Sequence, residues 1–175
     1  YTVIGSNGGS CVGTATMFIF VVASPTVSAV AATPTICIGG SANLFAGGAA
    51  SYTWMPGNLN GGFVTVSPTV TTIYTVTGSN GGSCTGTTTV MVTVDTGPTM
   101  TVTSSPTTIC SSSGGSATLS ATGAVSYTWN PGAIISQSIT VSPTVTTTYS
   151  VTGINALGCT RTNTIQVTIT STPTL

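Results

Sequence analysis

The sequence predicts an all-β protein made of tandem β-sandwich repeats of about 75 residues each, and two observations support this. The first is the phrase Ser-Pro-Thr-Val-Thr-Thr-x-Tyr-x-Val-Thr-Gly, which occurs at 67–78 and 142–153 and whose end opens the chain. Self-similarity at a fixed period indicates repeated structural units. The second is a series of short runs in which apolar and polar residues alternate between turn signals, with no helical periodicity.

The tyrosines of the repeated phrase lie 73 and 75 residues apart, at Tyr1, Tyr74 and Tyr149. Residues 25–96 and 97–175 are therefore expected to be complete repeats. Residues 1–24 are expected to be strands F and G of an incomplete upstream repeat, at 1–4 and 14–22, because Asn7-Gly8 between them is a strong hairpin signal. An isolated hairpin is marginally stable in water. We therefore expect the chain to be a segment of a longer polypeptide.

The strands of the second complete repeat are expected, in the order A, B, C, E, F and G, at 100–103, 116–121, 126–129, 138–141, 147–152 and 163–170. Alternation along these strands predicts the core residues Tyr127, Trp129, Ile139, Val141, Tyr149, Val151, Ile165, Val167 and Ile169. Their counterparts in the first complete repeat are Tyr52, Trp54, Val64, Val66, Tyr74, Val76, Val90, Val92 and Val94. A strand-C tryptophan between two cysteines resembles the core of an immunoglobulin-like sandwich.

The five cysteines follow the repeat, with Cys11, Cys84 and Cys159 in one set and Cys37 and Cys110 in the other. Two cysteines per repeat without metal co-ligands favour disulfides in an oxidising compartment over buried free thiols. Four strands between the cysteines of a repeat would return the chain to the same end. This count predicts the bonds Cys37–Cys84 and Cys110–Cys159, with Cys11 unpaired or paired to an absent upstream repeat. A fifth strand within 132–137 would instead favour bonds between neighbouring repeats.

The near-absence of charge excludes several classes of function. Asp95 is the only acid and Arg161 the only base, and the chain has no Lys and no His. Acid–base catalysis, an activated nucleophile, a calcium or zinc site and nucleic-acid binding each need groups that are missing or dispersed. The longest strongly apolar run, Met17–Ala23, is too short to span a bilayer. We expect no enzyme, no cofactor, no metal, no nucleic-acid partner and no membrane span.

A family resemblance is carried by the phrases at 126–132 and 138–153 and by Gly158-Cys159-Thr160. They resemble the immunoglobulin-like or PKD-like tandem repeats of Bacteroidota surface proteins, which include gliding and adhesion proteins exported by the type IX system. The resemblance covers both complete repeats and the leading hairpin. It implies an extracellular, multi-repeat stalk or filament at the cell surface.

Outward positions predict how such repeats assemble, because they differ between copies while inward positions agree. Apolar residues replace polar ones at six outward positions of the earlier copies: Phe18, Phe20, Val22, Phe45, Phe63 and Ile73. Exposed apolar patches usually mark a contact surface, although single exposed apolar residues are ordinary. We expect these six side chains to contact neighbouring repeats or other copies of the chain. We also expect 97–175 to be the more solvated unit.

The competing hypothesis is a carbohydrate- or surface-binding β-sandwich module, with surface glycans as its partners. Trp54 and Trp129 would then be sugar-stacking platforms, or outward threonines such as Thr140 would bind ice or glycan. The fixed place of both tryptophans in strand C favours a core role. Threonine is also an ordinary strand former.

Overall fold

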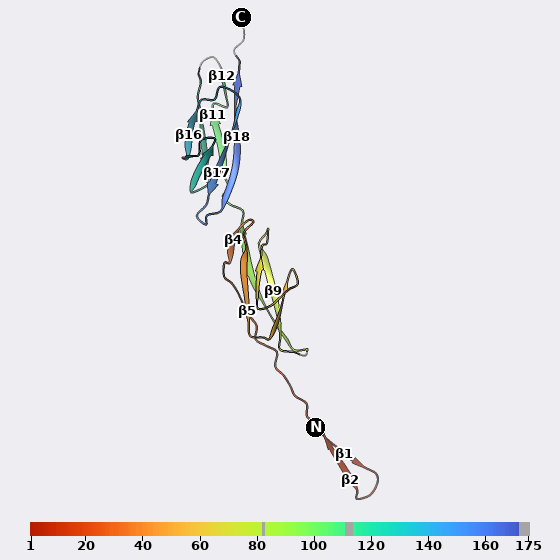
Figure 1. Ribbon diagram of the computed structural model, residues 1–175. Coiled ribbons are helices and arrows are strands. Elements are labelled where there is room, and N and C mark those ends of the chain that lie inside the picture. The colour runs from red at the N-terminus through yellow and green to blue at the C-terminus, as the bar shows by residue number, and fades with distance from the viewer. Residues whose placement is uncertain (82, 111–113, 172–175) are drawn as a thin grey trace.

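The computed structural model describes residues 1–81, 83–110 and 114–171, and these residues contain strands but no helix. No element of the described part could therefore cross a membrane as a helix. Figure 1 shows two β-sandwiches placed end to end, with a separate hairpin beyond the first of them.

The N-terminal hairpin consists of β1 (Thr2–Ser6) and β2 (Val12–Thr16), paired antiparallel from Thr2↔Thr16 to Ser6↔Val12. All of its residues are exposed. The sequence predicted a strand from Thr14 to Val22, but the strand ends at Thr16. In a complete repeat the last strand packs against an opposing sheet, whereas no second sheet formed by the described residues covers this hairpin.

Within the described residues, each complete repeat has one three-stranded and one five-stranded sheet. In the first repeat, the sheets have the orders β3-β5-β8 and β4-β10-β9-β6-β7. These strands are β3 (Ser28–Ala31), β4 (Thr35–Cys37), β5 (Ala42–Gly47), β6 (Ser51–Met55), β7 (Leu59–Asn60), β8 (Phe63–Val66), β9 (Thr72–Ser79) and β10 (Thr85–Asp95).

The second repeat has the same topology, with the orders β11-β13-β16 and β12-β18-β17-β14-β15. Its strands are β11 (Thr101–Ser105), β12 (Thr108–Cys110), β13 (Ala117–Thr122), β14 (Ser126–Asn130), β15 (Ile134–Ile135), β16 (Ser138–Val141), β17 (Thr147–Ile154) and β18 (Thr160–Thr170). In the lettering used above, the smaller sheet holds strands A (β3, β11), B (β5, β13) and E (β8, β16). The larger sheet holds A′ (β4, β12), G (β10, β18), F (β9, β17), C (β6, β14) and C′ (β7, β15), where A′ and C′ are the short strands that follow A and C. The predicted tandem immunoglobulin-like β-sandwich fold is therefore confirmed.

Two features of each sandwich differ from the predicted strand order, although the sequence left open a fifth strand within 132–137. The first strand divides, so that β3 and β11 join one sheet while β4 and β12 join the other as parallel partners of β10 and β18. Pro34 and Pro106 lie at the crossing points, where a residue without an N–H group cannot continue a ladder. The second feature is the short fifth strand, β7 or β15, after strand C.

The core of each sandwich lies between its sheets. Trp54 and Trp129 are fully buried, and Tyr74 and Tyr149 are buried beside them. The indole N–H groups donate to the Gly61 and Ser136 carbonyls at 2.9 and 3.0 Å, so neither tryptophan leaves a buried donor unpaired. All the predicted core residues are buried or packed against the two clusters. The prediction omitted Leu44 and Leu119, which are completely buried.

The repeated phrase has a structural explanation at the turn between strands E and F. The Thr72 and Thr147 hydroxyls each donate to the carbonyl two residues earlier, at 2.7 Å in both repeats. The Thr71 and Thr146 hydroxyls accept the Val94 and Ile169 amides of the neighbouring strand, at 3.1 and 3.0 Å. The threonine run therefore fixes the end of strand G to this turn.

Candidate functional site

A row of apolar side chains crosses the outer face of the first repeat's three-stranded sheet. Val30, Phe45 and Phe63 are cross-strand neighbours in register, on β3, β5 and β8. They remain 61%, 46% and 54% exposed. The two phenyl rings lie 5.1 Å apart between centroids and are tilted by 53°. Contact between the rings leaves about half of each one open to a further partner.

The same row in the second repeat is polar. Thr103, Ser120 and Ser138 occupy the matching register positions on β11, β13 and β16. The Ser120 and Ser138 hydroxyls hydrogen-bond to each other at 3.0 Å, and Ser138 also donates to the Leu119 carbonyl at 3.1 Å. The two repeats therefore share a backbone but present chemically different faces.

The five-stranded sheet of the first repeat carries a smaller apolar pair. Ile73 and Met91 are direct partners on β9 and β10, and both are exposed. Their counterparts Thr148 and Gln166 are polar. The first repeat thus has exposed apolar side chains on both of its sheets. Of the residues involved, Val30 and Met91 were missing from the predicted contact set, although strand alternation alone could have placed them beside Phe45 and Ile73.

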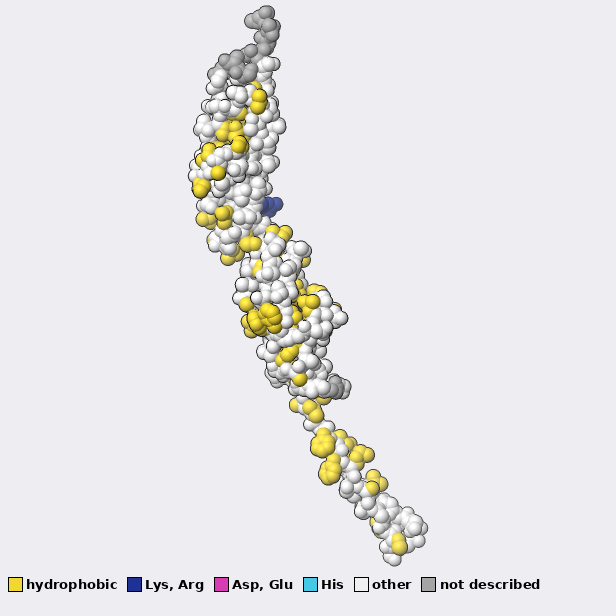
Figure 2. All heavy atoms as spheres, viewed as in Figure 1, with side chains coloured by type: hydrophobic (Ala, Val, Ile, Leu, Met, Phe, Trp, Pro, Cys, Tyr) yellow, Lys and Arg dark blue, Asp and Glu magenta, His cyan; other side chains and the backbone are white. Residues whose placement is uncertain are grey.

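The third apolar region is the segment between the hairpin and the first sandwich. Phe18 and Phe20 are 81% and 87% exposed, and Val22 is also open to solvent. Figure 2 shows hydrophobic side chains along this segment and on the surface of the first sandwich. The six predicted contact residues are therefore available at the surface.

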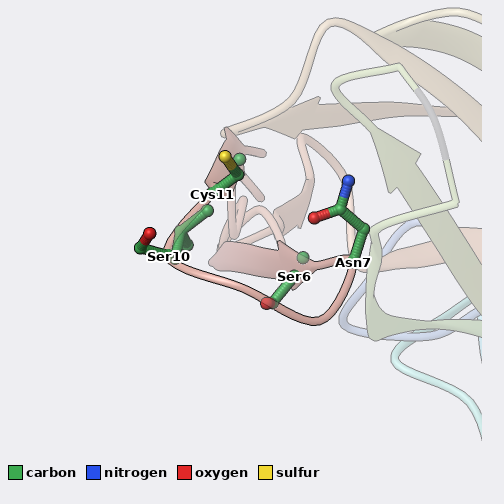
Figure 3. A pocket seen from close by; sticks show the side chains of 7 residues that line it. Ser6, Asn7, Ser10 and Cys11 are labelled. Atoms are coloured by element: carbon green, nitrogen blue, oxygen red, sulfur yellow. The ribbon is translucent and has the colours of Figure 1, made fainter.

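The hairpin turn encloses an open hollow of about 700 Å³. Figure 3 shows Ser6 at the end of β1 with Asn7 after it, and Ser10 and Cys11 on the side that leads into β2. All of these side chains are exposed. The hollow is bounded by one turn and contains no charged or buried polar group, so it does not have the features of a ligand site.

The two sandwiches are joined by a disulfide between Cys37 and Cys159, whose Cα atoms are 5.3 Å apart. The predicted pairs Cys37–Cys84 and Cys110–Cys159 are therefore wrong. The error came from the strand count, because β7 and β15 add a fifth strand between the cysteines of each repeat. An odd number of strands leaves those cysteines at opposite ends.

The distance between the ends of a sandwich makes a bond within a repeat impossible. In the ladder between β12 and β18, Cys110 lies opposite Thr170, the last residue of β18. Cys159 immediately precedes the first residue of β18. Since β18 has 11 residues, the two cysteines are roughly 36 Å apart. A disulfide requires Cα atoms within about 7 Å. Figure 1 shows β4 at the end of the first sandwich that faces the second, and β12 at the far end of the second.

The only acidic side chain of the sequence strengthens the same junction. Asp95 ends β10, and its carboxylate accepts the Gly97 amide at 2.7 Å and the Asn155 side-chain amide at 2.9 Å. Asn155 in turn accepts the Leu157 and Cys159 amides at 3.0 Å through its side-chain oxygen. This network orders the turn that carries Cys159.

The described residues include no group of three or more His, Cys, Asp or Glu side chains placed to hold a metal ion. The buried Trp54 and Trp129 present no surface on which a sugar could stack. The observed candidate surfaces are thus the apolar faces and the repeat junction.

Comparison with known proteins identifies structural neighbours only. No family model matches the sequence, and no curated protein matches it. Among solved structures, murine CEACAM1b is 14% identical with a TM-score of 0.39, over 83% of this chain and 100% of that one. A Ca²⁺-stabilized adhesin of an Antarctic bacterium is 18% identical with a TM-score of 0.45, over 99% and 57%. A bacterial ice-binding adhesin of 1.5 MDa is 13% identical with a TM-score of 0.38, over 86% and 66%.

Proposed function

We propose that this chain is a structural part of an extracellular bacterial surface filament or adhesin stalk. Its repeats are joined end to end, and its apolar outward faces contact neighbouring repeats or other copies. The observation that carries the proposal is the row Val30, Phe45 and Phe63, which lies exposed on one repeat and is polar on the next.

The difference between the repeats supports a selected contact surface. Drift would be expected to scatter apolar replacements, but here three of them meet on adjacent strands in one register. Burying a phenyl side chain contributes about 1.5–3 kcal/mol. The exposed halves of two rings, together with Phe18 and Phe20, are the apolar surface that a neighbour would bury.

The junction supports a role in bearing load. A disulfide that joins residues 122 positions apart resists separation of the two sandwiches. Such a bond also indicates an oxidising compartment, which agrees with a location outside the cell. A chain with one acid and one base has little charge to keep copies apart, so assembly through apolar contact meets little repulsion.

The first test replaces Phe45 and Phe63 by serine, which copies the polar row of the second repeat. We expect this double variant to lose self-association by at least tenfold in sedimentation velocity, because two buried rings are removed. The fold should persist, since both positions face outward. The matched control is Val145→Thr, which changes an exposed apolar residue of a turn on the other repeat.

A second variant, with Phe18 and Phe20 both replaced by threonine, examines the N-terminal segment in the same assay. Electron micrographs of the parent chain should show linear assemblies. If both double variants assemble as well as the parent, these faces are not the interface and the filament proposal fails.

A further inference from the structure

We propose that Cys84 is a cross-linking site for an upstream repeat. It would bond to the cysteine at the end of strand A′ in a repeat placed ahead of residue 25. Each junction between successive repeats would then be closed in the way that Cys37–Cys159 closes the one observed. This inference rests on the proposed tandem architecture and names the partner of that architecture as another repeat of this kind.

The first argument is the position of the cysteines in the sandwich. Cys84 and Cys159 occupy the same turn between strands F and G in the two repeats, and Cys37 and Cys110 both end strand A′. Every complete repeat therefore has one cysteine at each end. Cys159 uses its position to bond to the preceding repeat. Cys84 has the same position relative to a repeat that would precede the first sandwich.

The second argument is a contact that Cys84 already makes. Its Sγ atom lies 3.4 Å from the Val22 carbonyl oxygen. Val22 is the repeat equivalent of Asp95, 73 residues later. In the ladder between β4 and β10, Asp95 lies opposite Cys37, and the Asp95 backbone carbonyl accepts the Ile38 amide at 2.9 Å. The Cys84 thiol therefore lies beside Val22. In a complete upstream repeat, the residue opposite Val22 on the neighbouring strand would be the equivalent of Cys37, which is the cysteine that we expect Cys84 to bond.

The linkers at the two junctions also pack alike. Pro25 and Pro98 are equivalent, and both are buried. Between the hairpin and the first sandwich, the backbone at Gly86 is so close to the Pro25 carbonyl that a Cβ added to Gly86 would clash with it. Between the two sandwiches, a Cβ added to Gly97 would likewise lie only 2.5 Å from the Thr160 carbonyl oxygen. In each case the linker backbone touches the start of the following repeat's strand G. The linker would therefore deliver an upstream repeat to Cys84 as it delivers the first repeat to Cys159.

The bond forms by oxidation of two thiols. Each thiol loses one proton, the two sulfurs join, and the two electrons pass to a disulfide oxidant such as oxidised glutathione, which becomes two thiols.

The test uses the full chain with a copy of residues 25–97 inserted between residues 24 and 25. This insert preserves the spacing of the natural junction, since Gly97 again precedes the linker proline. After refolding with glutathione, peptide mapping without reduction should find nearly all of the original Cys84 joined to the inserted copy of Cys37. The native Cys37–Cys159 bond in the same molecule reports that the chain has folded.

A Cys84→Ser change in the original repeat is the matched control, and it should leave the inserted cysteine open to alkylation. A second insert, a copy of residues 98–172, should bond to Cys84 through its copy of Cys110. The proposal is overturned if Cys84 is alkylated in both insert chains, or if it bonds only to a second molecule. Because the readout is a bond within one chain, it can succeed or fail independently of filament formation.

Discussion

At the scale of single residues, the turn between strands B and C depends on a glycine. Gly123 has φ of 96°, and a Cβ placed there would contact the Thr99 carbonyl of the linker. We therefore expect Gly123→Ala to lower the free energy of unfolding by more than about 1 kcal/mol, through strain and through displaced backbone. Urea denaturation followed by tryptophan fluorescence measures this change.

The control for this prediction is Gly13→Ala in β2. Gly13 has ordinary backbone geometry, and nothing lies within 4 Å of the Cβ that would be added. Its replacement should leave the second sandwich unchanged. Equal losses in the two variants would show that crowding at Thr99 does not matter.

The residues of the core were the part most readily predicted from sequence. Strand alternation places Trp129, Tyr149 and Val151 between the sheets because side chains on one strand point to opposite faces in turn. The cysteine pairing was not predictable in the same way. It depends on whether the number of intervening strands is odd or even, and the two-residue strand β15 decides that number. A pair as short as Ile134–Ile135 gives almost no periodic signal.

At the scale of elements, the junction combines the disulfide with the contacts of Asp95. We expect Cys37→Ser to leave both sandwiches folded, because each has its own buried cluster, but to free them from one another. Small-angle scattering should then show a broader distribution of shapes than the parent gives. Calorimetry should show the second repeat unfolding independently of the first. Cys11→Ser, which changes an exposed thiol of the hairpin, is the control and should change neither measurement.

A variant of the junction that keeps the disulfide distinguishes the effect of the Asp95 hydrogen bonds from the effect of the disulfide. Asp95→Ala removes the acceptor of both the Gly97 and Asn155 hydrogen bonds while Cys37–Cys159 remains. We expect an intermediate effect in scattering, since hydrogen bonds to a charged group contribute about 1.5–3 kcal/mol. If this variant is as mobile as Cys37→Ser, the carboxylate rather than the disulfide orders the junction.

At the scale of the whole molecule, the strand plan followed from the repeat, whereas the position of one sandwich relative to the next did not. Periodicity reports which side chains share a core within a repeat. The relation between repeats depends on a short linker and on side chains that meet across it, such as Asp95 and Asn155, which lie 60 residues apart. The exposed apolar surface of the first repeat could be predicted from the sequence. Aligning the two repeats is enough to show that Phe45 and Phe63 stand where the second repeat has Ser120 and Ser138.

The near-absence of charge leads to a final prediction about how assembly responds to conditions. Salt screens interactions between charges, and this chain has one acid and one base, so self-association should change less than threefold between about 0.05 and about 0.3 M sodium chloride. Apolar burial weakens on cooling, so association should weaken between about 37 °C and about 5 °C. Sedimentation velocity at the four combinations measures both effects, with the Phe45→Ser, Phe63→Ser variant as the control that should lose the temperature dependence. A steep fall in association with salt would show that polar contacts hold the copies together, and the apolar faces would then lose their assigned role.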